Sequence, residues 1–219
     1  MTVVPRAQPE GFHPFHKPKG VSYMVEDSLR GIALAASLGK KWIDLDVNAT
    51  ADLVPILGHR DDPRKDHFIV PKWMIKKYNG KVRISNCTWS DLQKLRTKPL
   101  HFMGRSHVYK YRSTLEALIL CNEKSIGAAF EIKGRPLMED PRVYEQLLKD
   151  QERAYVPDNE VMWMTLQNIG NPLARLKAMT EAGGQGKRML LARGNKGIPV
   201  SWQPYIDYVR GPIKWDGTR

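Results

Sequence analysis

The sequence predicts an α/β fold, and within that class a (β/α)8 TIM-type barrel. Short apolar segments typical of buried strands alternate with segments of helical periodicity, which indicates βαβ units and a parallel sheet. A doubly wound sheet would show the same alternation, but no glycine-rich phosphate loop follows the first strand. Polar residues with catalytic chemistry stand at the ends of several predicted strands, and this pattern favours the barrel.

The predicted elements alternate along most of the chain. In chain order we expect an irregular lead-in at 1–11, a short strand at 12–16, a helix at 26–38, strands at 42–47 and 53–58, helices opening at Thr88 and at Ser113, a strand at 127–132, a helix at 141–149, a strand at 160–166, a helix at 172–182 and a strand at 187–192. Asp27 or Ser28 can cap the first helix, and Ser113 with Glu116 forms a capping-box pattern.

One segment, at about 60–86, departs from this pattern because it is polar and basic and shows no clear period. A stretch of this length inside a compact domain is usually functional or an insertion. We therefore interpret 1–219 as a single barrel domain with a basic insertion. At 219 residues the chain is shorter than the roughly 250 of a typical barrel. The last one or two strands are expected to be missing, shortened or rewired.

The composition indicates an anionic partner. The net charge is +12, from 35 Lys and Arg against 23 Asp and Glu, which favours phosphate polymers, nucleic acid or anionic headgroups. The basic residues are dispersed, so a merely solvated basic surface is an equal alternative. The two cysteines match neither a disulfide framework nor a zinc spacing. We see no signal peptide and no run of membrane-spanning length, so we expect a cytoplasmic protein or part of a larger assembly.

Two strands carry charge near their carboxyl ends. Asp44 and Asp46 are two apart and share a face of the first strand, and Glu131 and Lys133 do the same on the second. Carboxylates that meet at one mouth from several strands suit a hard cation such as Ca²⁺ or Mg²⁺. The alternative is a set of salt bridges with neighbouring lysines such as Lys41 and Lys133. His59, at the end of its own apolar run, can handle protons there.

An ordered series of segments over roughly 12–133 resembles the glycerophosphodiester phosphodiesterase family. The matching segments are His16-Lys17, Glu26-Asp27-Ser28-Leu29, Ile43-Asp44-Leu45-Asp46-Val47, Thr50 and Asp52 before Val54-Pro55-Ile56-Leu57-Gly58-His59, Thr88 with Leu92 and Leu95, Ser113-Thr114-Leu115-Glu116, and Phe130-Glu131-Ile132-Lys133. Each segment alone is a weak signal, but their order and spacing together are specific.

The resemblance implies a metal-dependent hydrolysis of glycerophosphodiesters to an alcohol and glycerol phosphate. Asp44, Asp46 and Glu131 would bind the divalent cation, Ca²⁺ or Mg²⁺. His16 and His59 would be the acid/base pair, with His13 as a rival for the first position. Lys17 and Lys133 would bind the phosphate. The substrate would be a phospholipid headgroup diester or a polyglycerol-phosphate polymer such as teichoic acid.

The departures from the family pattern keep other functions open. Lys17 and Pro18 replace the family's arginine and glycine, Asp44 replaces a glutamate, and Arg60 separates His59 from Asp61. A barrel that has lost activity and binds an anion or polymer within a larger assembly is the main alternative. A barrel enzyme acting on intact lipid, like sphingomyelinase D, is another. A nuclease has only the charge in its favour.

The carboxyl-terminal third shows the weakest resemblance, yet residues 198–215 are too apolar for a free tail. A parallel barrel without its last strand would leave unpaired backbone groups along an edge. We therefore expect either a compact substitute built from 195–219 or an intermolecular contact that covers this edge, which would make the protein an oligomer.

Overall fold

The computed structural model describes residues 6–7, 27–102, 105–192, 197–210 and 215–216. The predicted strand at 12–16 lies outside the described residues, and so do His13, His16 and Lys17. These three assignments therefore stay predictions.

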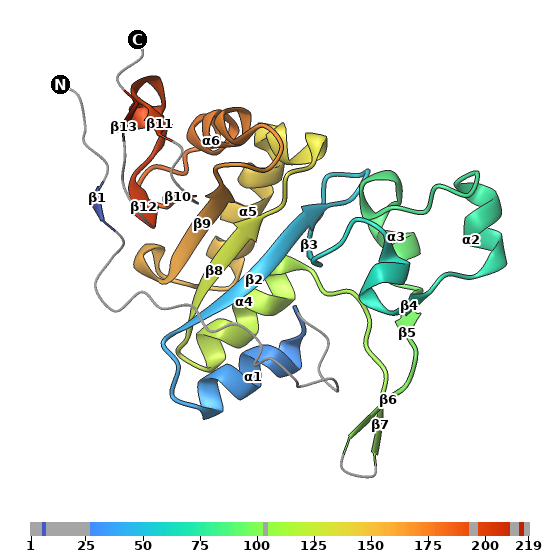
Figure 1. Ribbon diagram of the computed structural model, residues 1–219. Coiled ribbons are helices and arrows are strands. Elements are labelled where there is room, and N and C mark those ends of the chain that lie inside the picture. The colour runs from blue at the N-terminus through green and yellow to red at the C-terminus, as the bar shows by residue number, and fades with distance from the viewer. Residues whose placement is uncertain (1–5, 8–26, 103–104, 193–196, 211–214, 217–219) are drawn as a thin grey trace.

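The core of the molecule is a seven-stranded sheet, which crosses the centre of Figure 1. Its strands, in spatial order, are β1 (Arg6–Ala7), β12 (Tyr208–Arg210), β10 (Arg188–Leu191), β9 (Val161–Leu166), β8 (Gly127–Ile132), β2 (Trp42–Ala49) and β3 (Pro55–Leu57). All neighbours pair in parallel except β2 and β3, which form an antiparallel hairpin.

The winding of this sheet decides between the two predicted architectures. From β2 through β8, β9 and β10 to β12, each parallel strand pairs with the next parallel strand along the chain. A doubly wound sheet reverses direction at a switch point, and this sheet does not. Strand β1 lies beside β12, which is the neighbour relation that the first and last strands of a barrel have. In the described part of the chain, no pairing joins β1 to β3 at the two edges.

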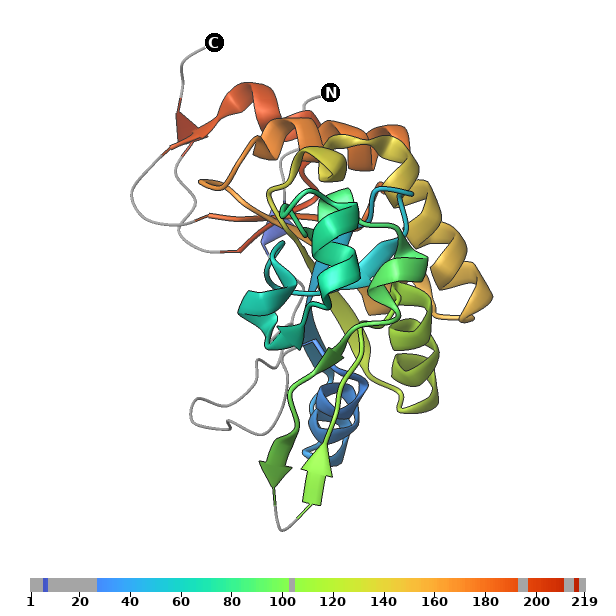
Figure 2. The ribbon, with the colours of Figure 1, turned by 90° about the vertical axis from the view of Figure 1, so that its right-hand side faces the viewer.

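Four helices cover one face of the sheet. They are α1 (Leu29–Ser37), α4 (Thr114–Glu123), α5 (Pro141–Arg153) and α6 (Pro172–Glu181), and α4 and α5 lie side by side in Figure 2. The main core contains alternate strand residues such as Leu45, Phe130 and Trp163 together with helix residues such as Leu118 and Leu176. The opposite face carries the small cluster of Ala129, Met162, Met164 and Met189. Alternate residues of each strand therefore point away from the helices, toward the barrel interior.

The predicted helix starts are confirmed by their caps. Ser28 caps α1, and its Oγ accepts a hydrogen bond from the Gly31 N–H. Ser113 and Glu116 form the complete capping box of α4. Beyond α6, a side chain at Gly184 would collide with the Trp163 ring and the Met179 carbonyl, so only glycine allows this close packing.

Residues 56–111 build a second, smaller core, seen at the right of Figure 1. Its elements are the 3-10 helices η1 (Pro63–Asp66) and η2 (Ile84–Asn86), the helices α2 (Lys72–Lys77) and α3 (Trp89–Leu92), and the strands β4 (Phe68–Ile69) and β5 (Arg96–Thr97). The hairpin of β6 (Leu100–Phe102) and β7 (Arg105–His107) extends from it. This ordered region reaches beyond the basic segment 60–86 on both sides. Its elements are too short to produce a period in the sequence.

Asp91 joins α2 to α3 within this region. Its buried carboxylate accepts hydrogen bonds from Lys77, from the Tyr78 hydroxyl at 2.7 Å and from Lys94 at 3.0 Å. The hydrogen bond from Lys77, followed by that from Tyr78, holds the pKa of Asp91 well below its usual range. Because the folded-state pKa is depressed, the ionised carboxylate stabilises the fold above the unfolded-state pKa of about 4, and this stability is lost as the pH falls below it.

We therefore expect Asp91→Asn to lower the free energy of unfolding at pH 7 by about 1–3 kcal/mol, since one buried acceptor loses its charge. The difference between variant and wild type should shrink between pH 4 and pH 2. Urea unfolding at pH 7, 4 and 2 measures both effects. Glu152→Gln, at an exposed position of α5, is the charge-matched control and should change little. A difference that grows toward low pH would contradict the assignment.

The carboxyl-terminal segment adds to the sheet. Strand β12 pairs with β10, and β11 (Ile198–Pro199), the 3-10 helix η5 (Val200–Tyr205) and β13 (Trp215–Asp216) surround it in sequence. Ile198, Ile206 and Val209 are almost fully buried in the main core. The segment is thus a packed part of the barrel, as the compact alternative predicted. Among the described residues, every helix is too short or too polar to cross a lipid bilayer.

Candidate active site

The site forms where β2 and β8 run side by side. Asp46 lies opposite Glu131 in the parallel register, and Asp44 lies opposite Ala129. Since alternate residues share a face, Asp44, Asp46, Glu131 and Lys133 all belong to the face away from the helices. The structure therefore brings together four of the site residues that the sequence predicted.

The three carboxylates are close enough to share one ion. One oxygen atom from each of Asp44, Asp46 and Glu131 lies within 4.8 Å of the others. Asp46 is only 9% exposed, so its charge needs compensation. Oxygen donors that converge in this way suit Ca²⁺ or Mg²⁺ and not a soft metal.

Lys133 supplies part of the compensating charge. Its Nζ lies 2.5 Å from Asp46 Oδ1 and 2.6 Å from Glu131 Oε1. Burial by itself would lower the pKa of Lys133, but the two carboxylates outweigh it and raise that pKa. The salt bridges considered from the sequence therefore exist for Lys133. With all three acids ionised, one lysine leaves two negative charges uncompensated, which matches a divalent cation.

Asp46 is itself buried, and its burial changes its own pKa. It raises the pKa of Asp46 to about 6, against the opposing attraction of Lys133. A buried carboxyl group whose pKa is raised beside charged partners is typical of a functional site.

His59 lies at the rim of this cluster. Its Nδ1 is 3.7 Å from Asp46 Oδ2, and its side chain is 33% exposed. The hairpin fixes this position, because the Gly58 N–H donates to the Asp46 carbonyl at 2.9 Å and the Asn48 side chain donates to the Gly58 carbonyl. His59 is thus held between the carboxylates and the solvent, and an imidazole in such a position can exchange protons.

Asp27 also supports the site, in a way that the sequence did not indicate. It was predicted as a possible cap of α1, but Ser28 fills that position. Asp27 has a positive φ of 61°, and its Oδ1 accepts a hydrogen bond from the Asp46 backbone N–H at 2.7 Å. It therefore ties the start of α1 to the centre of the carboxylate cluster.

A cavity of about 240 Å³ opens next to these residues. His59, Glu131 and Lys133 line it together with Arg60 and Arg135. From the sequence, Arg60 was only a departure from the family pattern, and Arg135 was not predicted as a site residue. Among the described residues, the buried Arg135 Nε has no hydrogen-bond partner, so this side chain keeps an unused donor next to the cavity. A charged donor in such a position suits a phosphate oxygen.

Comparison with known proteins identifies the family. The model of the glycerophosphoryl diester phosphodiesterase family matches residues 13–166, which include the whole carboxylate cluster. The chain belongs to this family. It is therefore a member of a family of phosphodiesterase enzymes, and its fold is the family's TIM-type barrel. A search of curated proteins finds no match.

Solved structures support the fold. An Oleispira antarctica phosphodiesterase, in complex with the product sn-glycerol-3-phosphate, has a TM-score of 0.62 at 16% identity over 92% of this chain and 70% of that one. A glycerophosphodiester phosphodiesterase from Parabacteroides distasonis has a TM-score of 0.54 at 16% identity, and the match covers 88% of this chain and 64% of that one. The chain thus spans about two thirds of the length of these enzymes.

Proposed function

We propose that the protein hydrolyses glycerophosphodiesters to an alcohol and glycerol phosphate with the help of a divalent cation. The observation that carries this proposal is a cluster of three carboxylates beside a cavity that Glu131, His59 and Lys133 line, in a member of this family. Asp44, Asp46 and Glu131 would hold the cation, and their oxygen donors favour Ca²⁺ or Mg²⁺. When bound, such an ion withdraws electron density from a phosphate oxygen and neutralises its charge.

The protein's own cations would bind the substrate phosphate. Lys133 lies within the carboxylate cluster, and Arg135 lines the cavity with a buried Nε that has no hydrogen-bond partner among the described residues. Lys17 would add a third positive charge, as the family resemblance implies. These contacts would fix the phosphorus atom in front of His59.

Two histidines would move the protons. One takes the proton from the 2-hydroxyl of the glycerol as its oxygen attacks the phosphorus. The other donates a proton to the alcohol oxygen as the phosphorus–oxygen bond breaks. Water then opens the cyclic phosphate and gives glycerol phosphate. His59 is held beside Asp46, whose carboxylate would stabilise the protonated imidazole, and His16 would be its counterpart.

We expect His59→Ala and His16→Ala each to lower the turnover of glycerophosphocholine by about 10²-fold or more, because each removes a proton-transfer group. The wild-type rate should follow a bell-shaped pH profile, and each variant should lose one limb. Initial rates in saturating Ca²⁺ between pH 5 and pH 9 measure this. His13→Ala is the matched control and should stay near wild type. If His13→Ala is damaging and His16→Ala is silent, the first position of the pair is wrong.

The substrate would be a phospholipid headgroup diester or a polyglycerol-phosphate polymer. The net charge of +12 supports a polyanion. Assays of glycerophosphocholine and of polyglycerol phosphate, each with added Ca²⁺ and with EDTA, test both the reaction and its need for a cation. Hydrolysis of neither substrate would overturn the proposal and leave the inactive binding module as the better account.

A further inference from the structure

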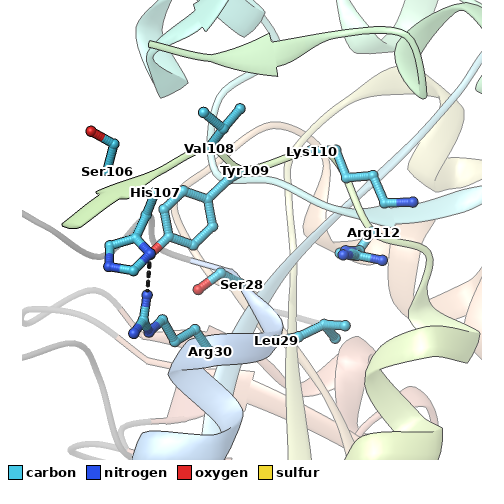
Figure 3. Close-up of a pocket in the computed structure, with 9 residues that line it drawn as sticks. All are labelled: Ser28, Leu29, Arg30, Ser106, His107, Val108, Tyr109, Lys110 and Arg112. Atoms are coloured by element: carbon cyan, nitrogen blue, oxygen red, sulfur yellow. Dashed lines mark hydrogen bonds between the residues drawn. The ribbon is translucent and has the colours of Figure 1, made fainter. Parts of the chain in front are cut away.

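A second cavity, of about 300 Å³, lies between the start of α1 and the chain that descends from β7 (Figure 3). Its polar lining comes from Ser28 and Arg30 on one side and from His107, Tyr109, Lys110 and Arg112 on the other. It shares no lining residue with the cavity at His59 and Lys133. Nothing in the proposed reaction uses it.

The lining is strongly positive. Arg30, Lys110 and Arg112 contribute three cationic groups, and none of the described residues that line the cavity is acidic. Arg112 is compensated, since it forms an ion pair with Glu116 at 2.6 Å. Lys110 is a partly buried residue whose charge also attracts Glu116, although no direct hydrogen bond or ion pair joins it to a described residue. Glu116 offsets only one of these two positive charges, so this side of the cavity keeps a net positive charge that an anion would neutralise.

The cationic groups frame the cavity from two directions. Arg30 donates a hydrogen bond to His107 Nδ1 at 2.7 Å, and this pair lies to one side of the Tyr109 ring in Figure 3. Lys110 and Arg112 lie to the other side of that ring. Ser28, the N-cap of α1, lies between the two groups, so the positive end of the helix dipole adds the same sign of potential.

We propose that this cavity is a second, non-catalytic binding site for the phosphate group of an organic phosphate. Phosphate oxygens accept hydrogen bonds from guanidinium and ammonium groups, and a ligand of this charge would neutralise the arrangement. The volume is sufficient for a glycerol phosphate unit and not only for a small ion. The phosphate can come from a distal unit of a long substrate or from free glycerol phosphate. The first source rests on the proposed function, and the second does not.

Calorimetric titration of the whole protein with sn-glycerol-3-phosphate tests the site without any turnover. The double variant Arg30→Gln/Lys110→Gln should weaken this binding by about tenfold or more, since two charged donors are lost. The charge-matched control Lys124→Gln/Lys149→Gln changes two exposed lysines on the helical side and should bind as the wild type does. The variant Arg135→Met changes the other cavity, next to Lys133. It should keep the binding of sn-glycerol-3-phosphate to the second site and lose only its binding to the candidate active site.

The source of the phosphate follows from a second measurement. If the site holds a distal unit of the substrate, the double variant should raise the KM for polyglycerol phosphate more than the KM for glycerophosphocholine. If it holds free glycerol phosphate, both KM values should change by the same factor while the titration still loses its binding event. Either result supports the site. Titration curves that are the same for the double variant, its control and the wild type would overturn it, whatever the enzymatic activity proves to be.

Discussion

Asp46→Asn is expected to reduce the turnover of glycerophosphodiesters by about 10²–10³-fold or more while the protein stays folded. Asp46 is the carboxylate that contacts both Lys133 and His59 and lies within 4.8 Å of the other two acids. The amide keeps the size of the side chain but removes the charge that, in the proposed function, would attract a divalent cation and stabilise a protonated His59. The backbone N–H that donates to Asp27 is unaffected.

Two measurements check this expectation. The rate of glycerophosphocholine hydrolysis is followed across a titration with Ca²⁺ and Mg²⁺, and the melting temperature is recorded in EDTA. Glu145→Gln, an exposed carboxylate on α5, is the charge-matched control. Near-normal turnover in Asp46→Asn would remove Asp46 from the site. Loss of the melting transition would instead show that the buried charge cluster is needed for folding, and the variant Asp44→Asn would then have to carry the test.

Local sequence patterns were sufficient for the strands that carry this site. Alternation placed Asp44 with Asp46 and Glu131 with Lys133 on common faces, and the structure confirms both pairs. The pairing of β2 with β8 is a contact between segments more than 80 residues apart, so no local pattern could predict it. The prediction that these faces meet depended on the family resemblance. In that family, the order of the matching segments along the chain is also the order of the strands around the barrel.

The intervening region shows where such patterns fail. Within the segment 60–86, helices and strands of two to six residues bury Phe68, Met74 and Ile84 in a core of their own, whereas the helix predicted to open at Thr88 is present as α3. Elements of this length complete neither a helical nor a strand period, so the sequence looked irregular. Arg135 was missed for a related reason. What singles it out is its place in a cavity wall and a buried nitrogen with no partner in the described part of the chain, which are properties of packing and not of spacing.

The carboxyl-terminal segment is expected to be essential for folding, so that deletion of 198–219 abolishes cooperative unfolding. Ile198, Ile206 and Val209 are almost fully buried, and truncation of one buried aliphatic side chain costs about 2–5 kcal/mol. A whole domain is stable by only about 5–15 kcal/mol. The deletion also exposes the edge of β10, whose backbone groups pair with β12 in the intact chain.

The deletion lowers the stability in a second way, because the segment also carries Asp207, the ion-pair partner of the buried Arg188. Arg188 is 5% exposed and is held by Asp207 through a two-point contact, with Nε at 2.7 Å and Nη2 at 2.8 Å. Removal of one partner of such a pair costs about 3–5 kcal/mol, since the other charge stays buried. Asp207→Ala should therefore destabilise the intact chain by part of the effect of the deletion, while Glu181→Gln, an exposed carboxylate on α6, should not. Thermal unfolding followed by circular dichroism compares the three proteins with the wild type. A truncated chain that keeps a sharp transition at the wild-type temperature would mean that the sheet is complete at β10 and that β12 is an appendage.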